Sequence, residues 1–168
     1  LAVAAGLAAL VVIGSAPPPP PPTPWTDAEK RAAAKEWRDA AAARGDVVKS
    51  EALAVAVNAV AGTVLKEADT PPVLVLKSAG VDAFALPDGG VVVTTELLPL
   101  LQSEAELAAV LAHARAHVGN GDVDRVLLER VELKGKGAAG ADLVAGAVYG
   151  IDDEILADAV AIRALRAG

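Results

Sequence analysis

The sequence predicts an α+β domain that is mainly helical and is built around a small antiparallel sheet of about three strands. Sequences typical of helix starts open alanine-rich stretches, and two β-type runs flank a turn rich in glycine. Hydrophobic residues make up 54% of the chain and aromatic residues only 2%, so the core must consist of Ala, Val and Leu. At 168 residues the chain has the length of one domain and can bury such a core.

Five segments are predicted to be helical: residues 26–43, 47–68, 103–118, 122–133 and a last helix that begins at Asp152. Thr26 with Glu29, and Ser103 with Glu106, have the spacing of a capping box, in which each side chain satisfies a backbone N–H group at the helix start. Gly45 is expected to end the first helix, because glycine accepts the left-handed conformation common at helix ends.

The strands are predicted between the second and third helices. Residues 73–76 form one β-type run, and residues 83–86 and 91–94 form two more. Pro87-Asp88-Gly89-Gly90 separates the last two runs, and its turn chemistry favours a hairpin.

The N-terminal part differs from the rest in composition. Residues 1–16 resemble a secretion signal or a membrane-anchoring segment, although the apolar run is shorter than the roughly 20 residues that span a bilayer. Residues 17–25 form a proline-rich linker, and residues 26–168 form the folded domain. The sequence therefore predicts an exported, periplasmic or membrane-anchored protein, with membrane association through residues 1–14.

Composition also restricts the partners and the chemistry. A net charge of −7 and a pI near 4.8 provide no basic surface for nucleic acid, so no nucleic-acid partner is expected. The chain has no cysteine, so a metal ion would have to be held by histidine and carboxylate side chains.

His113 and His117 are the only histidines, and they lie four residues apart in a predicted helix, so both rings leave the same face. This is the spacing of a two-histidine metal site. Glu154 is the natural candidate for a third ligand, and Asp158, one turn later, could accept a hydrogen bond from a ligand histidine. The spacing also fits two unrelated helical histidines, and Glu154 also suits the acidic first turn of a helix.

Three motifs in order resemble a known family. They are residues 82–94 (DAFALPDGGVVVT), residues 106–113 (ELAAVLAH) and residues 154–158 (EILAD). The stretch from about residue 50 to 168 is similar to the gluzincin metallopeptidases that include the CAAX prenyl endopeptidases and the HtpX-like bacterial proteases. The resemblance implies one zinc ion held by His113, His117 and Glu154, with Asp158 as a supporting carboxylate.

The resemblance also implies an extended peptide or protein substrate bound beside the cleft by strand addition. The segment from Phe84 to Thr94 would form this edge, and the substrate-binding candidates are Phe84, Ala85, Gly89 and Gly90.

The chain departs from the family where the first histidine is followed by glutamate, because Ala114 occupies that position. This glutamate is the general base, so peptide-bond hydrolysis is expected to be absent or strongly impaired. Asp122, Asp124, Asp152 and Asp153 could replace it only if the fold brings them close. The alternatives are a pseudo-protease that binds extended peptides or a membrane partner without chemistry, and an artificial family-like sequence with no selected function.

Overall fold

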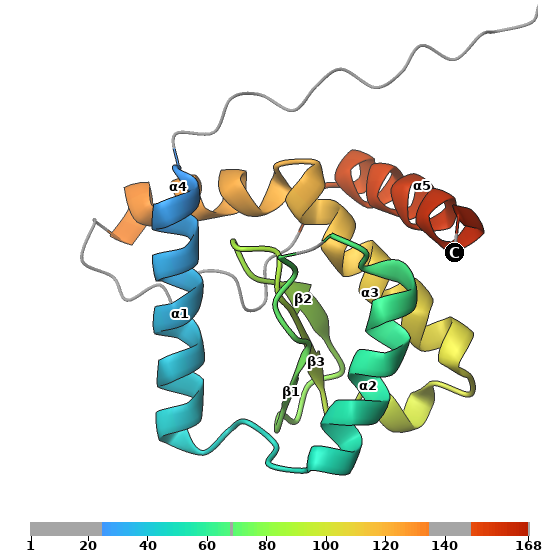
Figure 1. The fold of residues 1–168 in the computed structure, drawn as a ribbon. Coiled ribbons are helices and arrows are strands. Elements are labelled where there is room, and N and C mark those ends of the chain that lie inside the picture. Colours follow the sequence, from blue (N-terminus) through green and yellow to red (C-terminus); the bar gives the residue numbers. More distant parts are fainter. Residues whose placement is uncertain (1–24, 68, 135–148, 168) are drawn as a thin grey trace, which may run out of the picture.

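The computed structural model describes residues 25–67, 69–134 and 149–167. Within them the chain forms five α-helices and one three-stranded sheet, which confirms the predicted mainly helical α+β fold (Figure 1). The predicted N-terminal segment 1–16 and nearly all of the proline-rich linker lie outside the described residues. Among the described helices, none combines the length and the apolar character that crossing a membrane requires.

Helix α1 (Asp27–Arg44) begins and ends at the predicted signals. The Thr26 side chain accepts a hydrogen bond from the Glu29 N–H, and the Glu29 carboxylate accepts one from the Thr26 N–H, which completes the capping box. Gly45 ends the helix with φ at 78°, in the left-handed region that glycine adopts without strain.

Helix α2 (Glu51–Val64) is shorter than the predicted helix 47–68. It begins after Ser50, whose side chain accepts a hydrogen bond from the Leu53 N–H, while Val47 pairs instead with Leu76 as an isolated β-bridge. The predicted start was wrong because Val47 and Val48 continue the apolar spacing of the helix. In the structure their side chains also pack in the core, but they precede the helix.

The sheet is mixed, not purely antiparallel as predicted. Its strands are β1 (Leu74–Leu76), β2 (Ala83–Ala85) and β3 (Val91–Thr94), in the order β1-β3-β2. β2 and β3 form the predicted antiparallel hairpin, whereas β1 runs parallel to β3. The reason is topological, because β3 inserts between β1 and β2 after the hairpin turn.

The sheet lies between two helical layers (Figure 1). On one face Trp37 of α1 packs with Phe84 and Val92. On the other face Val91 and Val93 pack with residues of α2 and α3, among them Val57 and Leu111. The alternation along β3 therefore sends successive side chains to opposite layers, as the strand pleat requires.

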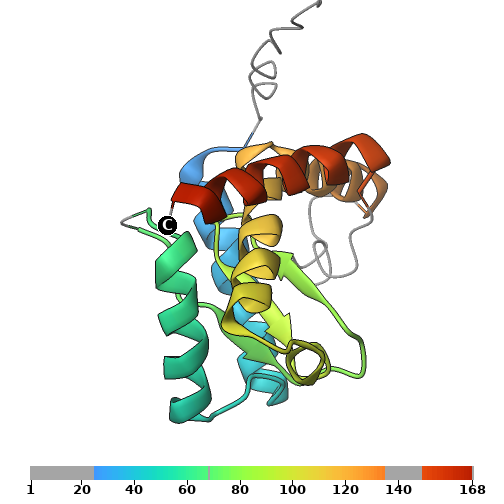
Figure 2. The ribbon, with the colours of Figure 1, turned by 90° about the vertical axis from the view of Figure 1, so that its right-hand side faces the viewer.

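Helix α3 (Glu104–Gly119) is the central helix of the domain, and a short 3₁₀ turn (Leu98–Leu100) precedes it. It packs against α2, β2, α4 (Asp122–Lys134) and α5 (Ile151–Ala167). Figure 2 shows α5 crossing the upper end of α3. This crossing brings the last turns of α3 next to the first turns of α5.

Candidate metal centre

The two histidines and Glu154 meet where α3 and α5 cross. The Nε2 atoms of His113 and His117 lie 3.3 Å apart. The Oε2 atom of Glu154, in the first turn of α5, lies 3.1 Å from Nε2 of His113 and 3.8 Å from Nε2 of His117. One nitrogen or oxygen atom from each side chain therefore faces a common point.

The spacing of these three atoms fits a tetrahedral zinc ion. Ligands at about 2.0–2.1 Å from a tetrahedral centre lie about 3.3 Å from one another. The three observed separations of 3.1, 3.3 and 3.8 Å bracket this value. Two imidazole nitrogens and one carboxylate oxygen are also a donor set that zinc accepts while leaving a fourth position open.

Each histidine is held by its own carboxylate on the side away from this point. Asp158 lies with Oδ1 2.8 Å from Nδ1 of His113, and Asp122 lies with Oδ2 2.8 Å from Nδ1 of His117. A carboxylate in this position accepts a hydrogen bond from Nδ1–H, and a histidine tautomer held in this way presents its Nε2 lone pair to a metal. The sequence predicts this role for Asp158, whereas it indicates Asp122 only as a replacement base. Its position directly after the Gly-Asn-Gly break that follows His117 is the signal that could have identified it.

The two histidines differ in exposure. His117 is 3% exposed, and the ring of Tyr149 stacks on it with centroids 3.9 Å apart. The side chain of His113 is 31% exposed and that of Glu154 is 43% exposed. The buried side of the centre is thus closed by Tyr149 and Asp122, and a ligand would approach from the side of His113 and Glu154.

Ala114 belongs to the main hydrophobic core and is 2% exposed. Its methyl group packs in the same cluster as Leu111, Val57 and Val93. A methyl group can neither accept nor donate a proton, so this position contributes no acid–base chemistry.

Three of the four acids that were candidates to replace the glutamate have other contacts. Asp122 accepts the hydrogen bond from His117, Asp124 pairs with Lys30 at 2.5 Å, and Asp153 pairs with Arg125. Asp152 is exposed in the first turn of α5. Three of the four candidates are therefore held by a basic side chain or a ring.

The predicted peptide-binding residues fall into two groups, and the first is on β2. The Phe84 ring packs edge-on against Trp37 with centroids 5.5 Å apart, and Ala85 is buried with Val123 and Leu127. Their side chains therefore serve the core. β3 is the central strand, so the expected edge extending to Thr94 is reduced to β2, whose backbone has one strand neighbour in the described sheet.

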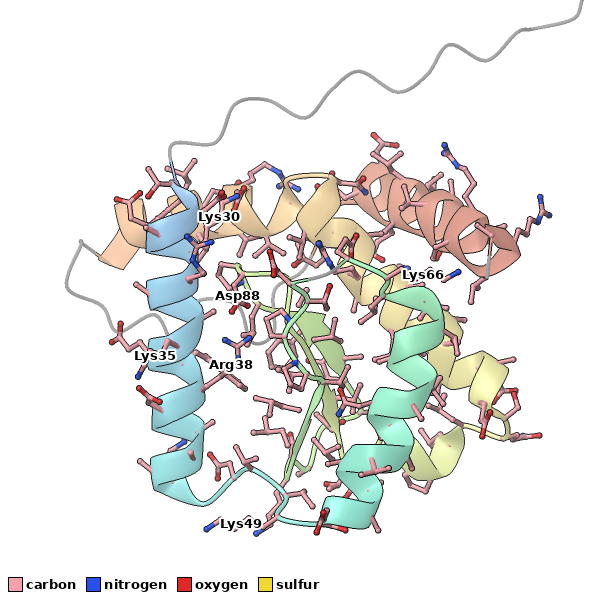
Figure 3. All side chains as sticks on the ribbon, in the orientation of Figure 1. Lys30, Lys35, Arg38, Lys49, Lys66 and Asp88 are labelled. Carbon is pink, nitrogen blue, oxygen red and sulfur yellow. The ribbon has the colours of Figure 1, made fainter. Side chains whose placement is uncertain are left out.

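The second group, Gly89 and Gly90, lies in the hairpin turn between two arginines. A Cβ on Gly89, whose φ is 88°, would lie 3.2 Å from Cζ of Arg115, and a Cβ on Gly90 would overlap Nη2 of Arg38. Arg38 in turn donates to both carboxylate oxygens of Asp88 at 2.7 and 2.9 Å, and Figure 3 shows these two side chains facing each other. The two glycines therefore make room for two arginine side chains, and one of these, Arg38, fastens the turn to α1 through Asp88.

Comparison with known proteins identifies a family for this chain. The family model of Peptidase family M48 matches residues 48–161, which is more than half of the chain. The matched segment contains the sheet, α3, α4 and the ligand-bearing turns of α5. No curated protein matches the chain.

Proposed function

Since the chain belongs to peptidase family M48, we propose that it binds one zinc ion through His113, His117 and Glu154 and that its hydrolysis of peptide bonds is lost or strongly impaired. The observation that supports zinc binding is the meeting of these three ligand atoms, all within 4.8 Å of one another. The observation that supports impairment is Ala114, which takes the place of the family's glutamate beside the first histidine.

The residues around the centre suit metal binding better than catalysis. A bound zinc ion lowers the pKa of a coordinated water to about 7 and polarises a carbonyl group. Asp158 and Asp122 orient the two rings, and Tyr149 covers the ring of His117. The missing step is proton transfer, because no side chain at position 114 can take the proton of the water or deliver it to the leaving amine. General acid–base catalysis contributes about 10²–10⁴-fold to rates, and the expected loss has this size.

An extended peptide or protein is the proposed ligand. β2 lies at one edge of the described sheet and packs against α3, the helix that carries both histidines. Its backbone N–H and C=O groups could pair with a peptide strand by β-augmentation. Because Phe84 and Ala85 face the core, the strand would recognise main-chain atoms more than side chains.

The second candidate function is a pseudo-protease that binds extended peptides or a membrane partner and performs no hydrolysis. Ala114 favours it, because strand addition does not need a general base. For both candidates, the apolar residues 1–14 support the proposal that the protein is exported, periplasmic or membrane-anchored.

The two candidates are separated by assaying the zinc-loaded protein with an internally quenched, unstructured peptide. A slow peptidase cleaves this peptide slowly. A chelator abolishes the cleavage, and the His117→Ala variant shows none. A binding module shows saturable binding of the same peptide, with no product after long incubation. Cleavage at the rate of an ordinary protease would refute the proposed impairment, and the absence of both cleavage and binding would refute the peptide ligand.

A further inference from the structure

Arg125, on the first turns of α4, lies between two carboxylates that belong to opposite sides of the metal centre. Its Nη2 atom is paired with Oδ2 of Asp153 and lies 3.7 Å from Oδ1 of Asp122. Asp122 uses its other oxygen to accept the hydrogen bond from His117, and Asp153 directly precedes Glu154 in the sequence. The guanidinium group of Arg125 therefore lies beside Asp122, which supports the α3 ligand His117, and beside Asp153, which precedes the α5 ligand Glu154.

We propose that Arg125 is a positioning residue for the metal centre, which fixes Glu154 relative to His117 by clamping Asp153 to Asp122. This inference rests on the proposed zinc site. It assigns a role in that site to a residue that contacts none of the three ligands.

The contacts at the start of α5 explain how the clamp reaches Glu154. Oδ2 of Asp153, the oxygen that pairs with Arg125, also accepts a hydrogen bond from the Gly150 N–H at 3.0 Å. The Glu154 N–H donates to the carbonyl of Gly150 at 3.0 Å, which forms the first turn of the helix. The Asp153 carboxylate therefore both caps this turn and pairs with Arg125. It fixes the position of the backbone that carries Glu154.

Electrostatics supplies a second reason for a cation at this position. Asp122, Asp153, Glu154 and Asp158 all lie around the centre, and their negative charges repel one another while no metal is bound. A guanidinium group is cationic and planar, so that of Arg125 can serve two carboxylates at once. Its Nη1 atom also lies 3.8 Å from Oε1 of the exposed Glu129, one turn further along α4.

The clamp is tested by measuring zinc affinity with a competing chromophoric chelator and by recording the visible spectrum of the cobalt-substituted protein. Arg125→Ala and Asp153→Asn each remove the ion pair, and the asparagine can still accept from the Gly150 N–H. We expect each variant to bind zinc on the order of tenfold more weakly, the lower end of the effect of altering residues behind metal ligands. The double variant should be no weaker than either single variant, because all three lack the same interaction.

Two variants serve as matched controls. Glu129→Ala removes an exposed carboxylate near Arg125 that lies one turn further along α4. Arg163→Ala removes an exposed arginine of α5 that donates to the carbonyl of Ala159 in its own helix. Both should keep the zinc affinity and the cobalt spectrum of the wild type. Unchanged affinity in Arg125→Ala and Asp153→Asn, or additive losses in the double variant, would overturn the clamp while leaving the zinc site intact. A wild-type protein that binds no zinc would overturn both proposals.

Discussion

If the proposed impairment arises from Ala114, replacing this residue by glutamate should supply the proton transfer that the proposal takes to be missing. The ligands, their supporting carboxylates and the covering tyrosine are in place, so the variant adds one group to an otherwise assembled site. Restoring a general base is expected to raise kcat/KM by about 10²–10⁴-fold. This corresponds to a barrier lower by about 3–5 kcal/mol, at 1.36 kcal/mol for each factor of ten.

The same substitution has a structural cost that can be anticipated. Ala114 is 2% exposed and packs in the main core, so a larger side chain must displace neighbours or turn toward the centre. Overpacking of this kind costs about 1–3 kcal/mol, which would lower the melting temperature by several degrees. Ala114→Gln is the matched control, since it adds the same volume without a group that can accept a proton.

The assay compares both variants with the wild type as zinc-loaded proteins, with an internally quenched peptide as substrate and thermal unfolding to confirm that each is folded. Cleavage should increase in Ala114→Glu alone and should be abolished by a chelator. If Ala114→Glu is folded and holds zinc but cleaves no faster than Ala114→Gln, the missing base is not what limits this centre.

Two further predictions concern the hairpin turn and the carboxylate that supports His117. Gly90→Ala should destabilise the fold by up to about 3 kcal/mol in urea unfolding, because Arg38 must leave the nearly buried carboxylate it pairs with. Gly62→Ala, in α2 with open space around it, should instead stabilise by about 0.5–1 kcal/mol; equal effects of the two would refute the packing explanation. Asp122→Ala should weaken zinc binding about 10–100-fold in chelator competition, since the buried Nδ1 of His117 loses its acceptor, and an unchanged affinity would contradict that support.

Local signals were enough to predict most of the helices. The hydrogen bonds at Thr26 and Ser103 and the left-handed Gly45 depend on residues within a few positions of one another, so the sequence shows them directly. The second helix was predicted too long, because Val47 is apolar at helical spacing but pairs with a strand. The parallel pairing of β1 with β3 could not be predicted, since the order of strands depends on contacts far apart in the chain.

Part of the candidate metal centre could also be predicted from local sequence patterns. The four-residue spacing of His113 and His117 is local, and the resemblance to a known family suggested Glu154. Asp122 lies only five residues after His117, so its contact with that ring follows from the break between α3 and α4. The contact between Arg125 and Asp153 depends instead on the approach of α4 to α5, which no local pattern reports. The sequence indicates Gly89 and Gly90 as substrate-binding residues, whereas the structure packs arginine side chains against them. These arginines come from α1 and α3, far from the turn in the sequence.

Zinc stoichiometry of the purified protein tests the proposed centre most directly. After saturation with zinc and dialysis, elemental analysis should find one ion per chain in the wild type. Separate variants His113→Ala, His117→Ala and Glu154→Gln should bind the ion much more weakly or not at all, whereas Arg163→Ala should bind it normally. A wild-type chain that retains no zinc, or variants that retain it as well as the wild type, would contradict the assignment of these three side chains as a metal site.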